Sequence, residues 1–368
     1  MYLHVPFCTS RCDYCAFATW TDRHHLHDTY VDAVLAELAA AAARGALRPA
    51  TSVFFGGGTP SLLGGRRLAR LLDAVDRVEG AEVTVECNPE TTTAELLDAL
   101  VEAGVTRLSL GVQSMVPHVL RGLGRHHRPD QVRRAVDRLG AAGIERYSVD
   151  LIYGGFGEQD ADWVATLDAV LALDPAPTHL SAYALTVEPG TPLWRDPARH
   201  PDDDVQARRY ELADDLLAAA GLDWYEVSNW ARPGHACRHN RTYWQQGDYL
   251  GVGCAAHSHR SGRRWWNVRH LDRYLEAVAR GGTAVAGEER LGPDEAALEA
   301  LQLALRTRDG VPDHAFPPDR LARLEDGGPL GPLVERHGRR LVLTRRGRLL
   351  CNVVAGDLLP RTLTISAG

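Results

Sequence analysis

Short β-rich runs alternate with longer Ala- and Leu-rich stretches along roughly the first 230 residues of this 368-residue chain. The β-rich runs predict strands near 1–6, 51–56, 82–87, 106–112, 145–152 and 178–185. The stretches between and after them predict helices near 28–44, 66–78, 92–103, 129–142, 160–173 and 203–220. Strands and helices in this alternation form parallel βαβ units with right-handed crossovers. The sequence therefore predicts an α/β fold, in which six βα units make a curved parallel sheet or partial barrel.

Several of the predicted strands alternate hydrophobic and polar residues. The runs 82–87, 108–113 and 148–151 show this period of two, which places the polar side chains on one face of the sheet. Three side chains of that face fall at or just beyond the carboxyl ends of their strands: Glu86, Gln113 and Asp150. Barrel active sites are built at these ends. We therefore expect a ligand cavity inside the barrel; an open sheet with one solvated face is the alternative.

The chain divides into three segments by composition. Residues 1–228 carry the βα alternation, and 229–290 are rich in Gly, His, Trp and Arg without a clear period, so we expect an irregular accessory segment there. Residues 291–368 begin with a helical stretch near 293–306, continue through a Pro- and Gly-rich patch at 310–332, and include a strand-like run at 339–344. This last segment predicts a small, mainly helical or winged-helix-like domain.

Charge and hydropathy exclude some classes of partner. The formal net charge is -7 and the Arg residues are scattered, whereas nucleic-acid binding needs a concentrated basic surface. No apolar run reaches the 18 or so residues of a membrane span, and no charged-then-apolar leader opens the sequence. We therefore expect a cytoplasmic protein without a membrane span.

Three of the seven cysteines, Cys8, Cys12 and Cys15, fall within eight residues directly after the first predicted strand. An odd number of cysteines in a large chain is a poor disulfide framework. A loop that presents three thiolates can hold an iron–sulfur cluster and leaves a fourth iron open to another molecule. A structural zinc ion is the competing ligand, but it takes four protein ligands, and no second Cys or His pair follows at a suitable spacing.

The spacing Cys-x3-Cys-x2-Cys after the first strand of a partial barrel resembles that of the radical S-adenosylmethionine superfamily. The resemblance implies a [4Fe–4S] cluster whose fourth iron is bound by the amino and carboxylate groups of S-adenosylmethionine. It also implies an electron donor for the cluster, cleavage of the sulfonium and formation of a 5′-deoxyadenosyl radical.

The run Gly56-Gly57-Gly58-Thr59-Pro60 follows the second predicted strand. Glycines let the backbone approach closely and can turn free N–H groups toward a carboxylate or amine; a tight βα turn is the alternative. In the superfamily, this position meets the methionine amino group. By the same resemblance, the residues that contact the cofactor are Tyr2, Gly57, Gly58, Thr59, Glu86, Gln113, Arg125 and Asp150.

A further group of unusual residues runs from Cys237 to Trp244. A neutral His can ligate heme iron while aromatic rings pack on the macrocycle, although a lone His is more often a hydrogen-bonded structural residue. The pattern His-Asn-x-x-Tyr-Trp resembles a motif of the HemW heme chaperones, relatives of oxygen-independent coproporphyrinogen III oxidase. Other stretches that match this branch are GGGTPSLL, ECNPET, LSLGVQS, DLIYG, HLSAYALTVEPGTPL and YEVSNWA. The resemblance implies that heme is bound by His239, Asn240, Tyr243 and Trp244 and passed to an acceptor protein.

Phe17 decides between the branches of this family. The porphyrinogen-decarboxylating enzymes carry a further Cys two positions after the third cluster ligand, where this chain has Phe17. The resemblance therefore favours a heme chaperone over a coproporphyrinogen III dehydrogenase, with a radical S-adenosylmethionine methyltransferase as the alternative. Whether the protein is an enzyme or a non-catalytic chaperone is left open. The sequence departs from the HemW pattern at Ala16 and at 154–157.

Overall fold

The computed structural model describes residues 1–281, 284–316, 318–324, 328 and 330–358. Strands and helices alternate along its first part: β1 (Tyr2–Val5), α1 (His27–Ala43), β2 (Ala50–Gly57), α2 (Gly65–Asp73), β3 (Arg77–Cys87), α3 (Ala94–Glu102), β4 (Arg107–Gln113), α4 (Pro117–Gly122), α5 (Pro129–Ala141), β5 (Tyr147–Tyr153), α6 (Asp160–Leu171), β6 (His179–Ala184) and α7 (Asp203–Ala219). Strands β1 to β6 pair in sequence order, and every pair is parallel. The prediction of six successive βα units is confirmed.

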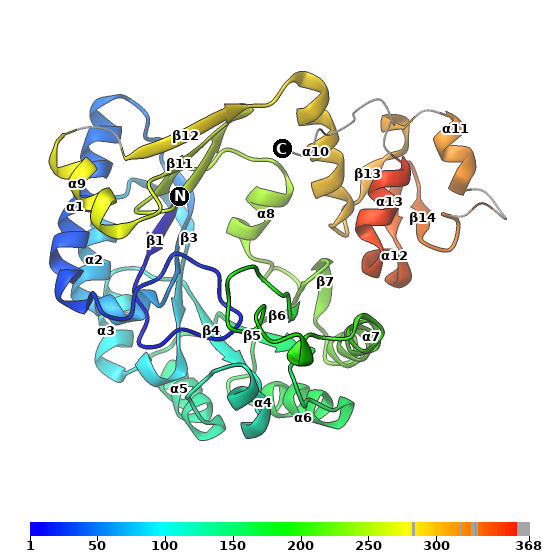
Figure 1. The fold of residues 1–368 in the computed structure, drawn as a ribbon, viewed down its shortest axis with the longest axis horizontal. Helices are drawn as coiled ribbons and strands as arrows, with labels where there is room; N and C mark the ends of the chain where they lie inside the picture. The colour runs from blue at the N-terminus through cyan, green and yellow to red at the C-terminus, as the bar shows by residue number, and fades with distance from the viewer. Residues whose placement is uncertain (282–283, 317, 325–327, 329, 359–368) are drawn as a thin grey trace.

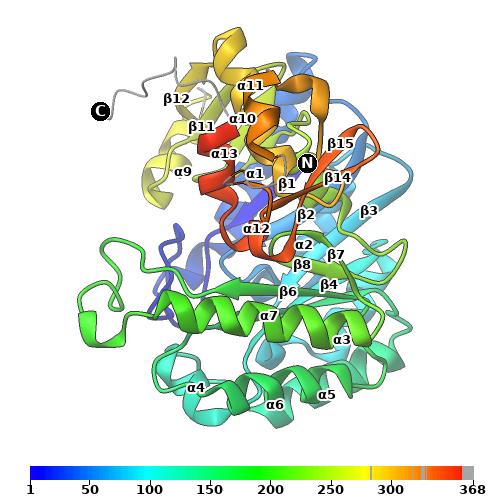
Figure 2. The same cartoon turned by 90° about the vertical axis from the view of Figure 1, so that its right-hand side faces the viewer.

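The sheet continues beyond these six strands and does not close. An antiparallel extension of β7 (Asp223–Glu226) and β8 (Asn229–Ala231) follows β6, and β9 (Gly251–Val252) adds to β1 at the other edge. Figures 1 and 2 show a curved sheet with helices covering its outer face. The predicted partial barrel is therefore confirmed.

The two faces of the sheet have opposite character. Side chains on the outer face, such as Val83, Val85 and Leu108, are buried against the helices and belong to the main hydrophobic core. Their neighbours along the strands, such as Thr84 and Ser109, face the interior. Since side chains alternate faces with a period of two, the alternation in the sequence had predicted this division.

Four details of the predicted elements are wrong. Strand β3 begins at Arg77 rather than near 82, so α2 ends five residues earlier than expected, and the short helix α4 was not predicted. Asp150 lies in the middle of β5, paired with Gly111 and Ser181, and not at the carboxyl end of the strand. Helix and strand ends depend on the register of neighbouring strands, which a single sequence does not show.

The described part of the segment 229–290 contains helices and strands, although its sequence shows no clear period. It forms an antiparallel sheet of β10 (His257–Arg260), β11 (Arg263–Asn267) and β12 (Val285–Arg290), together with α8 (Arg238–Trp244) and α9 (Leu271–Ala279). The strands are short and carry Arg, Trp and His rather than a plain alternation of polar and apolar residues, so their sequence shows little periodicity. In Figure 1 this sheet lies beside β1, and α8 lies within the curve of the main sheet.

The C-terminal elements have a small core of their own. They are α10 (Pro293–Leu305), β13 (Val311–Pro312), α11 (Pro318–Leu321), β14 (Val334–His337), β15 (Arg340–Leu343), α12 (Arg345–Leu349) and α13 (Cys351–Leu358). The expected helix near 293–306 and strand near 339–344 are α10 and β15, while residues 317, 325–327 and 329 of the expected Pro/Gly-rich patch lie outside the described residues. Arg348 of α12 attaches this unit to α7 through two hydrogen bonds to the buried Asp214, 2.9 and 2.7 Å long.

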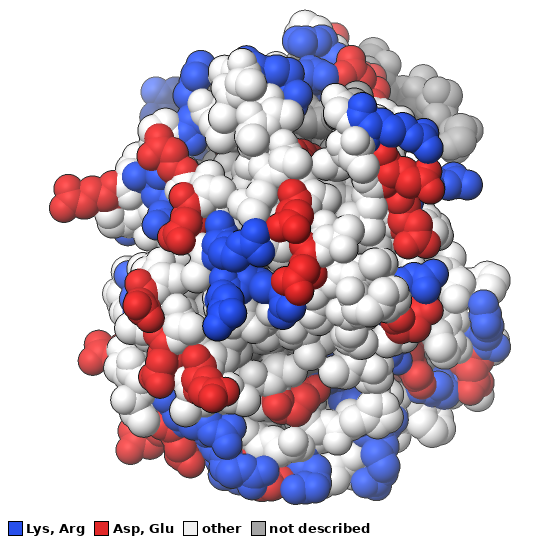
Figure 3. All heavy atoms as spheres, turned by 90° about the vertical axis from the view of Figure 1, so that its left-hand side faces the viewer, with Lys and Arg blue, Asp and Glu red and all other residues white. Residues whose placement is uncertain are grey.

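The molecular surface mixes charges. Figure 3 views the face that carries α1 and α2, where groups of positive and negative side chains are interspersed. Two ion pairs join these helices there: Arg67 with Asp28 at 2.7 Å and Arg70 with Asp32 at 2.9 Å. None of the helices in the described ranges combines the length and the apolar character that a membrane crossing requires.

Candidate functional site

The loop that follows β1 presents all three clustered cysteines to one cavity. Cys8, Cys12 and Cys15 are partly exposed and line a cavity of about 560 Å³, within the range of cofactor pockets. The loop is held by the segment between β6 and α7: Asp13 accepts a 2.7 Å hydrogen bond from Arg199, and its carbonyl oxygen accepts one of 3.0 Å from the backbone of Leu193. The structure therefore brings together the three side chains that the spacing had singled out.

The sulfur atoms have polar neighbours but remain largely available. Arg125 Nη1 donates to Cys12 Sγ at 3.5 Å, and Thr59 Oγ1 donates to Cys8 Sγ at 3.7 Å. Burial raises the pKa of Cys8 to about 11 and also raises the pKa of Cys15. Thiolate formation at Cys8 and Cys15 is therefore unfavourable without a cation nearby, as is usual for buried metal ligands.

This donor set fits a cluster better than a single ion. In the described ranges, no three His, Cys, Asp or Glu side chains are grouped closely enough to hold one metal ion. The three thiolates of a cubane bind three different irons, so they need to surround a cluster and do not need to converge on one point. Three partly exposed thiols on one wall of a large cavity meet that requirement.

The glycine run Gly56–Gly58 is required by close packing against β1. A Cβ atom on Gly58 would lie 2.5 Å from the carbonyl oxygen of Phe7, and one on Gly57, whose φ is +112°, would lie 2.5 Å from the ring of His4. The sequence left open whether the N–H groups of this turn face a ligand or belong to a tight βα turn. The amides of Gly58 and Thr59 donate to backbone oxygens of the β1 segment, and the amide of Gly57 donates to Glu86 at 3.1 Å. The turn still forms one wall of the cavity.

Two carboxyl groups face the interior next to this wall. Burial, followed by the charge of Asp150, raises the pKa of Glu86 to about 8, although the hydrogen bond from Gly57 opposes the shift. Burial also raises the pKa of Asp150, whose carboxylate accepts a 2.8 Å hydrogen bond from Ser109. Both side chains line the 560 Å³ cavity and are therefore placed to meet a cationic ligand.

Arg125 and Gln113 complete the polar wall, together with a residue that the sequence reasoning missed. Asn88 follows β3 directly; its Nδ2 donates to Thr59 Oγ1 at 3.1 Å and its Oδ1 accepts from Arg125 Nη2 at 2.8 Å. Its place just after a strand end was the signal that could have found it. Gln113 has a positive φ of 63°, a strained backbone conformation that is frequent at functional sites.

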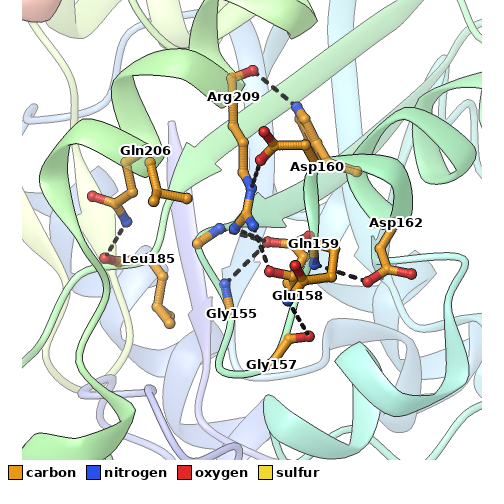
Figure 4. A network of polar contacts seen from close by, with 12 residues as sticks. Gly155, Gly157, Glu158, Gln159, Asp160, Asp162, Leu185, Gln206 and Arg209 are labelled. Atoms are coloured by element: carbon orange, nitrogen blue, oxygen red, sulfur yellow. Dashed lines mark hydrogen bonds and ion pairs between the residues drawn. The ribbon is translucent and has the colours of Figure 1, made fainter.

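The turn after β5 is held by a buried ion pair. We noted an unusual Gly154–Gly157 sequence at this turn, and Figure 4 shows what holds it. Glu158 Oε2 accepts hydrogen bonds from the amides of Gly154 (2.7 Å) and Gly155 (3.1 Å) and from Arg209 Nη1 (2.8 Å). Both side chains of this ion pair are almost fully buried. The pair fixes the chain directly beyond β5, which carries Asp150.

Tyr2 lies away from the cysteine cavity, although it was expected to contact the same cofactor. It stacks on Phe54 and His239, with ring centroids 6.3 Å away in each case. It lines two neighbouring hollows instead: a polar one of about 170 Å³ inside the barrel and a larger one of about 710 Å³ beside the cysteine loop. The cysteine cavity is not lined by Tyr2.

His239 is buried and both of its ring nitrogens have partners. Nδ1 lies 3.1 Å from Ser52 Oγ, and Nε2 lies 2.9 Å from the hydroxyl of Tyr243. Its pKa is lowered to about 3, because burial disfavours the charged imidazole. The start of α8 is also anchored, since Glu82 accepts hydrogen bonds from the amides of Arg238 (2.9 Å) and His239 (3.2 Å). In this arrangement His239 is the hydrogen-bonded structural residue that the sequence left open as an alternative.

The four residues of the His-Asn-x-x-Tyr-Trp motif do not share one surface. His239, Asn240 and Tyr243 line the polar hollow inside the barrel, and Tyr243 also reaches the 710 Å³ cavity. Trp244 lines a separate cleft of about 180 Å³, and the guanidinium of Arg306 lies 4.8 Å from the Trp244 ring centroid. Heme contact by all four residues stays a prediction that this geometry does not favour.

Comparison with known proteins gives the family. The sequence model of the Radical SAM superfamily matches residues 2–170. The chain is 46% identical over 374 aligned positions to "Heme chaperone HemW" of Mycobacterium tuberculosis, covering 98% of this chain and 94% of the relative. The chain belongs to the HemW family. It is also 32% identical to HemW of Bacillus subtilis, covering 97% of this chain and 98% of the relative.

The fold of this HemW-family chain also matches a solved structure. Coproporphyrinogen III oxidase (HemN) of Escherichia coli, a radical SAM enzyme, superposes with a TM-score of 0.84 over 97% of this chain and 89% of that one. The sequences are 23% identical, so this likeness shows a shared fold. Membership of the radical SAM superfamily implies a [4Fe–4S] cluster and S-adenosylmethionine as cofactors, and the cavity with three thiols and two partly buried carboxyl groups has the donor set that these would need.

Proposed function

We propose that this protein is a heme chaperone, which binds heme and delivers it to an acceptor protein. The observation that carries the proposal is the 46% identity to a heme chaperone over nearly the whole of both chains. Family membership extends through α8 and the C-terminal unit, so the similarity is not confined to the barrel that many radical SAM enzymes share. We also propose that it works in the cytoplasm, where a reducing environment keeps its seven free cysteines as thiols.

We further propose that Cys8, Cys12 and Cys15 hold the [4Fe–4S] cluster. S-adenosylmethionine would then lie in the 560 Å³ cavity, against the turn at Gly57–Thr59 and within reach of Glu86. A bound cluster would supply an electron to the sulfonium of this cofactor. Arg125 would lie next to Cys12, where its positive charge would offset the negative charge of the thiolates. Asn88 would position Arg125 and Thr59 through its hydrogen bonds to both.

Anaerobic reconstitution with iron and sulfide tests the cluster assignment. The wild-type protein should bind about four irons per chain and show the absorbance of a cubane, and Cys12→Ala should lose both. Cys351→Ala is the matched control, since Cys351 is buried in the small C-terminal core far from the loop. A full cubane in Cys12→Ala would exclude that residue as a ligand.

Heme binding and transfer test the chaperone proposal itself. Titration of the full chain with ferric heme should give a saturable Soret band at about one heme per chain. Mixing the loaded protein with apomyoglobin should move the heme to that test acceptor faster than heme leaves serum albumin. A protein that shows no saturable Soret change would contradict the proposal.

Phe17 weighs against porphyrinogen oxidation in this chain. Its side chain is 62% exposed and lines the cysteine cavity, at the position where the decarboxylating relatives have a thiol. A phenyl ring has no exchangeable proton, so it cannot take over the role of a thiol there. Anaerobic incubation with coproporphyrinogen, the cluster and S-adenosylmethionine should therefore yield no protoporphyrinogen.

A further inference from the structure

A second large cavity lies beside the cysteine loop and has aromatic walls. Its volume is about 710 Å³, and its walls include Tyr2, Phe17, Tyr243, Tyr249, His257 and Trp266. They come from β1, the cysteine loop, the region of α8, and the β10–β11 hairpin. A planar apolar macrocycle needs this combination of size and flat aromatic surface.

The other two hollows near α8 are too small for such a ligand. The polar hollow inside the barrel has a volume of about 170 Å³ and is lined by the charged or polar side chains of Glu86, Arg107, Asp150 and His179. The cleft that contains Trp244 has a volume of about 180 Å³. Both volumes fall below the roughly 300 Å³ at which ligand pockets begin.

Two histidines line the large cavity, and they differ in availability. His4 is buried, with Nδ1 3.0 Å from the Tyr2 hydroxyl and Nε2 3.1 Å from the carbonyl oxygen of Ala18. The side chain of His257 is exposed, and its ring makes no hydrogen bond to any residue in the described ranges. The ring instead stacks on Trp266, with centroids 6.0 Å apart and planes at 28°. His257 is therefore the imidazole of this cavity that is free to bind a metal.

We infer that the heme lies in this second cavity and that the imidazole of His257 ligates its iron. The inference rests on the proposed heme-chaperone function and names the binding site for it. The macrocycle would pack on Trp266 and Tyr249, with Tyr243 of α8 forming part of the wall.

The surroundings of His257 suit this role. Burial and the nearby positive charge of Arg269 lower its pKa, while Glu289 raises it, and the net result favours the neutral imidazole that ligates iron. Arg269 itself lines the cavity as an exposed cation; it donates to the carbonyl oxygen of Ala16 at 2.7 Å and can pair with a heme propionate. Ala255, two residues before His257, has a positive φ of 59°, a strained conformation of the kind found at ligand sites.

The inferred heme site adjoins the cavity proposed for the cluster and S-adenosylmethionine. Ala16, Phe17 and Gly57 line both the 560 Å³ cavity and the 710 Å³ cavity. Phe17 therefore lies between the sites inferred for S-adenosylmethionine and heme. It is also the position at which the branches of the family differ. Cofactor binding in the first cavity would contact the same loop that forms one wall of the second.

His239 becomes a positioning residue in this arrangement. Its Nε2 holds the hydroxyl of Tyr243, and Tyr243 packs edge-on against Tyr249 with centroids 4.7 Å apart. Loss of His239 would disturb this wall and weaken heme binding without removing an iron ligand. A fall in affinity alone therefore does not identify the ligand, whereas the spectrum of the bound iron does.

The experiment compares His257→Ala, His239→Ala and His25→Ala in the full chain, by titration with ferric heme and by electron paramagnetic resonance of the complexes. His25 is an exposed residue two positions before α1 and serves as the control. His257→Ala should bind heme about tenfold or more weakly and lose the wild-type spectrum, and imidazole should restore that spectrum in His257→Gly. His239→Ala should weaken binding but keep the wild-type spectrum.

The outcomes separate the two proposals. If the wild type binds no heme, the proposed function itself fails. If the wild type binds heme and His257→Ala keeps both affinity and spectrum, the assignment of His257 fails while the function stands. A wild-type spectrum that disappears in His239→Ala alone would move the ligand to α8. Trp266→Ala, which should lower affinity and leave the spectrum unchanged, separately tests the cavity.

Discussion

Glu158 and Arg209 form a buried ion pair beside the turn that follows β5. Arg209→Met would leave the Glu158 carboxylate, which is 0% exposed, with two backbone amides and no cation. It would also remove the 2.5 Å hydrogen bond from Arg209 Nη2 to the Glu158 carbonyl oxygen. Breaking one half of a buried pair costs about 3–5 kcal/mol, because the remaining charge is unpaired in a medium that solvates it poorly. We expect a loss of that size in the free energy of unfolding.

The loss should grow with pH. Burial raises the folded-state pKa of Glu158, and Arg209 opposes that rise. Without Arg209 the folded pKa moves further up, so the folded carboxyl holds its proton while the unfolded one is ionised. A group whose folded pKa is raised loses its contribution to stability as pH rises toward that pKa. Arg209→Met should therefore be less destabilised at pH 5 than at pH 8.

Urea unfolding followed by circular dichroism measures both effects. Arg208→Met is the matched control: Arg208 is half-exposed, and its pair with Asp160 also lies near the surface, so the expected cost is about 0–1 kcal/mol. The double variant Glu158→Leu/Arg209→Met should recover part of the loss, because no unpaired buried charge remains. Equal costs for Arg208→Met and Arg209→Met would refute the reasoning.

Three further predictions concern the interior, α8 and the C-terminal unit. Since the folded pKa of Glu86 is raised to about 8, its ionisation opposes folding increasingly between pH 4.5 and 8. Without cofactors, the free energy of unfolding of Glu86→Gln, measured with urea, should equal that of the wild type near pH 4 and exceed it at pH 8. The difference should be at most about 5 kcal/mol, since each pKa unit corresponds to about 1.4 kcal/mol. Glu82→Leu removes the acceptor of two α8 amides, so hydrogen exchange in 238–244 should speed up while that of α5 does not change. Arg348→Met removes two hydrogen bonds to Asp214 and a guanidinium that lies 4.3 Å from the Trp224 ring centroid. Because these contacts attach the C-terminal unit to α7, limited proteolysis near residue 291 should become faster in this variant. Unchanged cleavage would contradict the attachment.

The sequence determined the architecture and singled out the cysteine loop. Period-two alternation in the run 82–87 told which side chains face the barrel interior, because strand geometry forces neighbouring residues to opposite faces whatever surrounds them. The spacing of Cys8, Cys12 and Cys15 is likewise a local property, so a short loop had to bring them to one place. Glu86 was found from the same pattern, and the structure places it on the cavity wall as expected.

Only the tertiary structure decided which residues near α8 are available to a ligand. The sequence singled out His239 through its motif, but Ser52, 187 positions away, occupies one nitrogen of its ring. The ring of His257 stacks on Trp266 and makes no hydrogen bond within the described residues. The aromatic cavity is likewise assembled from β1, the cysteine loop and a hairpin more than 240 residues later. Burial and hydrogen-bond satisfaction depend on such distant partners, and a local sequence pattern carries no information about them.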